Sequence, residues 1–172
     1  MSTNLQLIKS TKSTDLVANV SLQNVFSSQY KEYELHITFH NASANGGYGG
    51  LRFFDSSDTI IDGTEYAYAG SHLKDNGSFD NSWIDTDATF LAPLYLDAND
   101  DSRGGGCVVK IFNPNSSSDY TYVVVESATY GDGGLMGAKT LGHHLGAETI
   151  TGVQILNVST TRSLNVVLYG VL

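Results

Sequence analysis

The segment with the clearest metal-ligand spacing contains Asp97, Asn99 and Asp101. These residues match the D-x-[DN]-x-[DN] opening of a calcium-binding loop, in which carboxylate and amide oxygens coordinate the ion. The rest of the motif is absent, because Ser102 stands where the loop requires glycine and Val108 stands where it requires a bidentate glutamate. An EF-hand is therefore excluded. The segment predicts either an irregular calcium site at a loop tip or a solvated acidic loop that ends a strand.

A second acidic segment, residues 75–87, contains Trp83, the only tryptophan of the chain. Asp80 and Asp85 lie close to it in sequence. Aromatic faces stack on sugar rings while carboxylates accept hydrogen bonds from sugar hydroxyls, so this mixture of residues predicts a glycan contact. The alternative is a long surface loop that Phe79 and Trp83 anchor to the core.

Other catalytic and metal motifs are incomplete. His36 and His40 are four residues apart on a predicted strand, which separates them by about 13 Å and prevents them from sharing a metal ion. The glycine-rich segment 131–137 nearly spells G-x-G-x-x-G, but Met136 replaces the last glycine. No G-x-S-x-G motif occurs. We therefore expect no enzymatic activity, and no cofactor unless the Asp97 segment binds calcium.

Composition restricts the partners of the chain. The 172 residues carry 9 basic and 18 acidic side chains, for a net charge of −9, so we expect no nucleic-acid partner. No segment has the length and apolarity of a membrane span or of a secretory signal, and we expect no membrane insertion. Cys107 is the only cysteine, and it is predicted to be a small buried apolar residue on a strand.

The elements that must position these residues are β-strands. Apolar and polar residues alternate along residues 33–40, which is typical of a strand with one exposed face. Similar patterns, separated by Gly, Asn, Asp and Ser, predict about ten strands, at residues 5–9, 16–22, 33–40, 51–54, 65–69, 88–96, 107–112, 120–126, 149–158 and 163–172. Helix is expected to be minimal, with a single turn at residues 24–30. The pattern indicates an antiparallel β-sandwich.

We expect one domain over residues 1–172, in which residues 1–22 form the first strands or an N-terminal arm. The chain ends on an apolar strand whose Leu164, Val166 and Leu168 should face the core. The other face of that strand then needs a cover. Several strands are apolar on both faces, which predicts that the protein assembles as a homo-oligomer. The residues that we assign to these core or assembly strands are Tyr122, Val124, Val166, Leu168 and Tyr169.

Short segments resemble a known group of proteins. NVFSSQYKEYEL, at residues 24–35, is similar to the entry segment of small β-sandwich virion proteins of tailed bacteriophages. The closing strands of that family resemble residues 151–157 and 166–170 here. LRF, at residues 51–53, and IFNP, at residues 111–114, fall where the family has corresponding strands. These motifs are structural, and they carry no catalytic residues across.

The resemblance implies a jelly-roll-like sandwich in a virion assembled in the host cytoplasm. Its place would be the exterior of the particle, as a tail-fibre, tail-tip, neck or capsid-decoration protein, and we expect a trimer that also contacts other virion proteins. Residues 41–50, 75–87 and 97–106 are our candidates for outward contacts. The alternatives are a carbohydrate-binding module that recognises host surface glycans and an accessory domain of a glycosidase or depolymerase.

Overall fold

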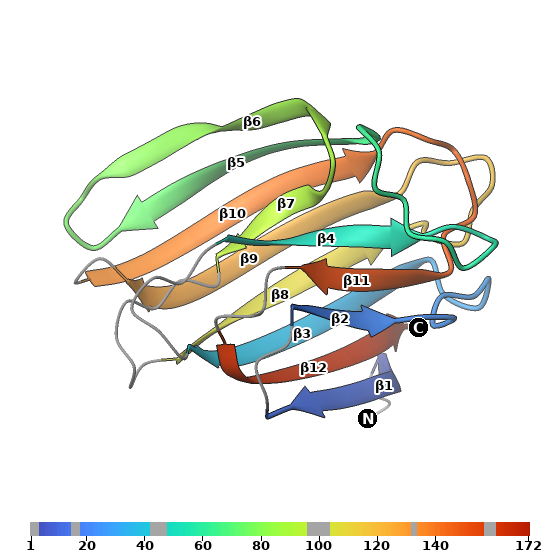
Figure 1. Ribbon diagram of the computed structural model, residues 1–172, viewed down its shortest axis with the longest axis horizontal. Helices are drawn as coiled ribbons and strands as arrows, with labels where there is room; N and C mark the ends of the chain where they lie inside the picture. Colours follow the sequence, from blue (N-terminus) through green and yellow to red (C-terminus); the bar gives the residue numbers. More distant parts are fainter. Residues whose placement is uncertain (1–3, 15–17, 42–47, 96–103, 132–133, 157–160) are drawn as a thin grey trace.

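The protein is an antiparallel β-sandwich (Figure 1). The computed structural model describes residues 4–14, 18–41, 48–95, 104–131, 134–156 and 161–172. These residues form twelve strands and no helix, which confirms the predicted all-β class. The described residues include no helix that is long and apolar enough to cross a membrane.

The larger sheet has eight strands, and every neighbouring pair in it is antiparallel. In spatial order these strands are β1 (Leu5–Ser13), β12 (Thr161–Val171), β3 (Glu32–Asn41), β8 (Gly104–Phe112), β9 (Tyr122–Gly131), β10 (Gly134–His144), β5 (Tyr66–Lys74) and β6 (Phe79–Ala88). The smaller sheet contains β2 (Asn19–Leu22), β11 (Gly152–Leu156), β4 (Tyr48–Phe54) and β7 (Leu91–Tyr95).

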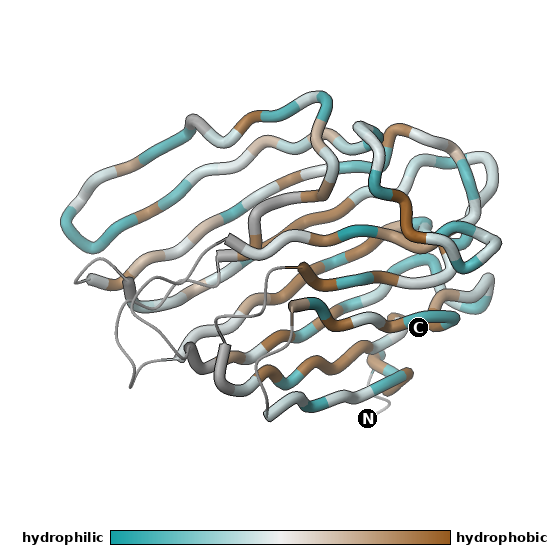
Figure 2. Tube along the Cα trace, in the orientation of Figure 1, coloured by the Kyte–Doolittle hydropathy of each residue, from teal (hydrophilic) through white to brown (hydrophobic). Residues whose placement is uncertain are grey.

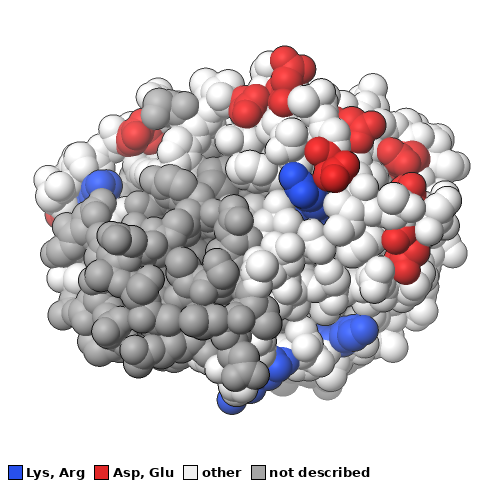
Figure 3. Space-filling model, in the orientation of Figure 1, with Lys and Arg blue, Asp and Glu red and all other residues white. Residues whose placement is uncertain are grey.

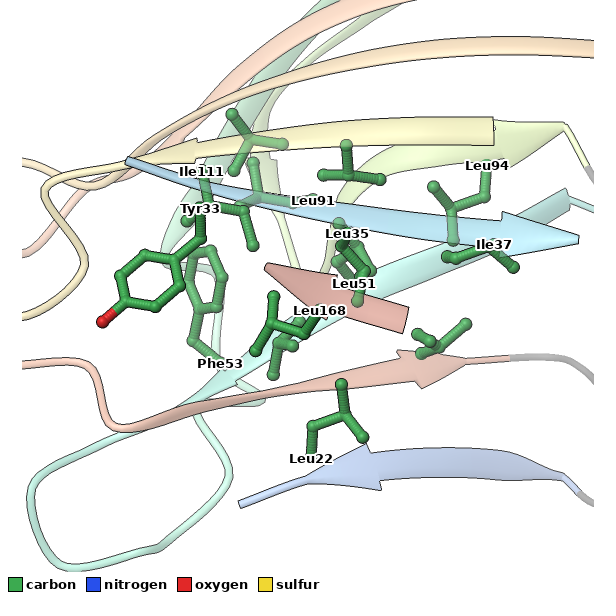
Figure 4. Packing of buried hydrophobic residues seen from close by; sticks show 14 of the residues in the cluster. Leu22, Tyr33, Leu35, Ile37, Leu51, Phe53, Leu91, Leu94, Ile111 and Leu168 are labelled. Carbon is green, nitrogen blue, oxygen red and sulfur yellow. The ribbon is translucent and has the colours of Figure 1, made fainter. Parts of the chain in front are cut away.

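The core lies between the two sheets and follows from strand alternation. In β3 the side chains of Tyr33, Leu35, Ile37 and Phe39 are buried, while the residues between them point to the outer face of the large sheet. Figure 4 shows Leu35 and Leu168 of the large sheet close to Leu51 of the small sheet, and Figure 2 shows the matching runs of hydrophobic residues. Burial of these faces holds the sheets together.

The C-terminal strand β12 lies inside the large sheet, between β1 and β3. Leu164, Val166 and Leu168 are buried, as the alternation predicts. Val167 and Tyr169 are half-buried on the outer face. The apolar end of the chain is therefore held by two neighbouring strands of the same chain.

The N-terminal strands pair within the chain as well: β1 pairs with β12, and β2 pairs with β11. The predicted helical turn at residues 24–30 is wrong. The backbone N–H groups of Val25 and Phe26 donate to the carbonyl of Thr151 instead of to a helical partner. The Phe26 ring still packs inward, with its centroid 4.7 Å from that of Tyr33 in an edge-to-face contact.

Two strands were not predicted. Residues 75–87 were expected to form a loop, but β6 occupies most of the segment, and only a tight turn around Gly77 (φ 80°) precedes it. No strand was predicted between residues 126 and 149, but β10 occupies Gly134–His144. Both segments are rich in residues of low strand propensity. They form strands because β5 and β9 supply hydrogen-bonding partners along their length.

The small sheet covers only part of the large one. Figure 1 shows β5, β6 and β10 extending beyond β7 on the left of the view. The inner face of these strands carries a small second apolar cluster, in which Met136 and Ala138 are buried and Trp83 packs against them. This part of the sheet is where the predicted glycan residues are found.

We expect Leu168→Ala to lower the free energy of unfolding by about 2–5 kcal/mol, because it removes a fully buried side chain from a strand with two neighbours. Asn165→Ala changes an exposed residue of the same strand and should cost roughly 0.5 kcal/mol or less. Urea denaturation of both variants measures the difference. Equal stabilities would contradict the placement of β12 in the core.

Candidate functional site

The three predicted glycan residues lie on one face of the edge strand β6. The strand register places Asp80 opposite His72, Trp83 opposite Gly70 and Asp85 opposite Tyr68. The β5 residues alternate along that strand and share its inner face, so their cross-strand partners share it too. Two irregularities in the pairing allow the uneven spacing along β6 to place Asp80, Trp83 and Asp85 on this face. We call these three residues, with Tyr68 and His72, the β6 site.

Trp83 packs against neighbouring strands and also exposes part of its ring at the β6 site. Its side chain is half-buried against Met136 and Ala138 of β10 and makes an edge-to-face contact with the His72 ring. Gly70, opposite Trp83 in the strand pair, has no room for a side chain, since a Cβ there would lie 2.6 Å from the Thr140 hydroxyl oxygen. The tryptophan thus anchors β6 across β5, and part of its surface remains accessible.

Tyr68 supplies a second aromatic surface beside Trp83. Its ring is stacked with that of Phe90, with centroids 6.3 Å apart and an interplanar angle of 25°. Burial, together with the negative charge of Asp85, raises the pKa of the Tyr68 hydroxyl. The hydroxyl therefore stays protonated at neutral pH and can donate a hydrogen bond.

His72 is buried, and this burial lowers its pKa to about 4. The charge of Lys74 lowers the pKa further, and the charge of Asp80 opposes the shift. The imidazole is therefore neutral at physiological pH. Among the described residues, the charges at the β6 site are the carboxylates of Asp80 and Asp85, and the ammonium group of Lys74 lies nearby.

Phe79 does not anchor the segment as predicted. It pairs with Leu73, on the outer face of the sheet, and 62% of its surface is exposed. The prediction failed because it assumed a loop, in which Phe79 and Trp83 could turn the same way. In β6 the irregular pairing between the two residues places them on opposite faces, whereas a regular strand would place residues four apart on the same face.

The predicted calcium ligands Asp97, Asn99 and Asp101 lie outside the described residues, and the site stays a prediction. The loop candidates 41–50 and 97–106 also fall largely outside them. Among the described residues, no three His, Cys, Asp or Glu side chains are grouped to hold a metal ion. Cys107 is buried, and burial raises the pKa of its thiol to about 12.

The outer face of the large sheet carries many exposed apolar side chains. Of the predicted assembly residues, Tyr122, Val124 and Tyr169 lie on this face, while Val166 and Leu168 lie in the core. The pairing of β9, β10, β5 and β6 extends the same face to large side chains that are 47–68% exposed, namely Leu73, Phe79, Ile84, Tyr122, Leu135 and Leu141. We call this group the outer apolar patch.

A shallow groove of about 330 Å³ crosses the patch. Ala67 and Ala69 of β5 form its floor, because their small side chains lie between larger ones. Ile84 stands on one side, and Leu141 and Tyr122 stand on the other. The groove therefore has an apolar floor and apolar walls.

The charged groups of the outer face largely neutralise one another. Lys139 and Glu126 are 2.7 Å apart, and Lys110 and Glu34 are 3.4 Å apart. A hydrogen bond with His36, followed by the influence of Lys110, lowers the pKa of Glu34. The strand registers place three acidic and three basic residues on this face, namely Glu32, Glu34, Glu126, Lys12, Lys110 and Lys139.

Sequence reasoning missed Tyr68 and His72 as parts of the β6 site, and Ile84 and Leu141 as parts of the outer apolar patch. The alternation of Tyr68 and His72 with the small residues between them was a signal for a longer β5. Leu141 carried no comparable signal, because β10 itself was hidden in a glycine-rich segment.

Comparison with known proteins adds little. No protein-family model matches the chain, and no curated protein matches it. Among solved structures, the chain is similar to a marine PL-14 alginate lyase from Aplysia kurodai, with 8% identity over 86% of this chain and 72% of the lyase, and a TM-score of 0.36. It is also similar to an E230A-fructofuranosidase from Schwanniomyces occidentalis complexed with fructosylnystose, with 12% identity over 91% of this chain and 34% of that protein, and a TM-score of 0.23. We draw no function from likenesses this weak.

The lowered pKa of His72 predicts a pH dependence of stability. Between the ordinary histidine pKa of about 6.5 and the folded value of about 4, the unfolded chain binds a proton that the folded chain does not. The His72 contribution is therefore constant above this window and is lost as the pH falls through it.

Urea denaturation at about pH 7, 5.5 and 4.5 measures this loss. We expect His72→Phe and His72→Gln, which both remove the titrating group, to lose less stability over this range than the wild-type protein. The two variants can differ in absolute stability, but both should show the flatter profile. Profiles parallel to that of the wild type would contradict a neutral buried His72.

Proposed function

We propose that this chain is a non-enzymatic structural protein of a bacteriophage virion, and that it assembles as a homo-oligomer on the outside of the particle. The observation that carries the proposal is the outer apolar patch, which leaves large side chains exposed on the widest surface of the molecule. Within the patch, Ile84, Leu141 and Tyr122 line one groove, and soluble monomers rarely expose a contiguous apolar surface unless they bind a partner there.

The strand edges are poor sites for association, which favours the face instead. In the large sheet, β1 carries Lys9, Lys12 and an irregular pairing, and β6 has irregular pairing and turns Asp80 inward. In the small sheet, β2 has four residues and β7 contains a proline. These features are the usual protection against edge-to-edge pairing.

The charge distribution favours a second copy as the occupant of the patch. With a net charge of −9, two copies repel each other at most orientations. The outer face is an exception, because the acidic and basic residues placed there by the described strand registers are equal in number, and Lys110 and Lys139 form ion pairs with Glu34 and Glu126. Two copies can therefore meet there without the repulsion that separates them elsewhere.

The resemblance to phage virion proteins supports the location. The segments that carry it contribute to β3, β4, β8, β11 and β12. These strands form the framework of both sheets, so the resemblance concerns the scaffold. The β6 site and most of the outer apolar patch lie on strands outside those segments, where a location-specific function would be expected.

We expect the wild-type protein to be oligomeric at micromolar concentration, and Leu141→Asp to shift it to the monomer, because the new carboxylate lies in the wall of the apolar groove, across from Ile84. Light scattering measures the mass, and circular dichroism checks that the variant is folded. Ser117→Asp adds the same charge at an exposed loop position and should leave the mass unchanged. A monomeric wild-type protein would contradict self-assembly through this face.

A second candidate function is glycan binding at the β6 site. The specific observation that favours it is the alignment of Asp80, Trp83 and Asp85 on one strand face, next to Tyr68. The combination of accessible aromatic surface with carboxylates is suited to sugar rings and their hydroxyls. The two functions are compatible, because the β6 site and the outer apolar patch lie on opposite faces of the sheet.

We expect the protein to bind host envelope glycans, and Trp83→Ala to abolish that binding because it removes the main stacking surface. A cell-wall pull-down or a glycan array measures binding. Since Trp83 also packs on Met136 and Ala138, thermal unfolding must show that the variant is folded. Trp83→Phe, which keeps an aromatic ring, should retain part of the binding. Binding that Trp83→Ala leaves intact would exclude the β6 site.

A further inference from the structure

We propose that the β6 site selects neutral or amine-bearing glycans and discriminates against polyanionic ones. This inference rests on the glycan-binding candidate above and adds the chemical class of the ligand. It follows from the negative charge of the hairpin formed by β5 and β6. A uronic-acid or sulfated polysaccharide is itself negative and requires a positively charged site.

The described part of this hairpin is predominantly acidic. Asp80 and Asp85 lie on the inner face of β6, and Asp87 follows close behind. Figure 3 shows acidic side chains along the upper margin of the molecule, where β6 runs. Lys74 is the one lysine or arginine of the two strands, against three aspartates on β6.

His72 does not offset this charge. A protonated histidine would be the natural partner for an anionic sugar, but burial keeps this imidazole neutral above about pH 4. The buried ring instead supports Trp83 through an edge-to-face contact. The site therefore presents neutral aromatic surfaces beside carboxylates.

The carboxylates of the β6 site are suited to hydroxyls and amines. Carboxylates accept hydrogen bonds from sugar hydroxyls, and they attract an ammonium group, whereas they repel another carboxylate or a sulfate. The Asp85 carboxylate already accepts the backbone N–H of Asp87 at 3.0 Å, which holds it in place. Beneath Trp83, the fully buried Thr140 hydroxyl has no hydrogen-bond partner among the described residues, and it lies against Gly70, the partner of Trp83 in the ladder.

The size of the discrimination can be estimated from Coulomb's law. A carboxylate about 5 Å from a ligand charge changes affinity roughly fourfold even at the dielectric constant of water. Two such groups together give roughly sixteenfold between ligands that differ in charge alone, and the opposite charge of nearby Lys74 reduces this to several-fold. Salt should reduce it, because the site is close to solvent.

The test has two stages. A glycan array that carries neutral, amine-bearing and acidic glycans first shows which classes the full chain binds. Titration calorimetry then compares three β-1,4-linked hexasaccharides of similar shape: cellohexaose, the chitosan hexamer and the glucuronan hexamer. We expect the glucuronan hexamer to bind at least several-fold more weakly than the best of the other two.

The double variant Asp80→Asn and Asp85→Asn should lose most of that difference while it still binds the neutral hexamer, because the amides keep the hydrogen-bonding shape but remove the charge. The matched control is Asp62→Asn with Asp119→Asn, which removes the same charge at exposed positions outside the hairpin. This control should discriminate as the wild type does.

The outcomes separate the two hypotheses. If no glycan on the array binds, the glycan-binding candidate fails. If acidic glycans bind as well as or better than neutral ones, glycan binding stands and the proposed selectivity is overturned. If the control pair and the site pair reduce discrimination equally, the effect belongs to net charge and the assignment to the β6 site is overturned.

Discussion

The eight strands of the large sheet are packed against a sheet of four, and this mismatch in width governs the rest of the structure. Strand alternation turns half of the side chains in each strand toward the inner face, where apolar groups gain free energy only if something covers them. The small sheet covers the region around β3, β8 and β12, and the core is deepest there. Beyond β7, the inner face of β5 and β6 changes to polar and aromatic residues.

That change in composition makes the β6 site physically reasonable. At an edge strand with one neighbour, Asp80 and Asp85 can face inward because the small sheet does not pack over them, and they also protect the edge from pairing. Trp83 compensates for the missing cover by lying across β5 onto β10. One strand thus combines edge protection, local packing and a surface suited to a ligand.

The outer face of the same sheet has the opposite property. It is apolar where a solvated sheet is usually polar, and its charges are balanced in a strongly acidic protein. A surface of this kind is typical of a contact face between proteins. For a component of a virion exterior, the arrangement would direct one face toward assembly and leave the other free.

The sequence by itself determined the class of fold and the division of many strands into two faces. The alternation in β3 and β12 assigned Leu35, Ile37, Val166 and Leu168 to the core, because burial of one strand face leaves a local, period-two pattern. It could not show β6 or β10, whose aspartates, asparagines and glycines have low strand propensity. These segments become strands only because β5 and β9 offer hydrogen-bonding partners. The pairing of residues distant in sequence, such as Tyr68 with Asp85 or Leu141 with Ala69, was decided by the tertiary structure alone, since strand order and register depend on the whole sheet and leave no local mark.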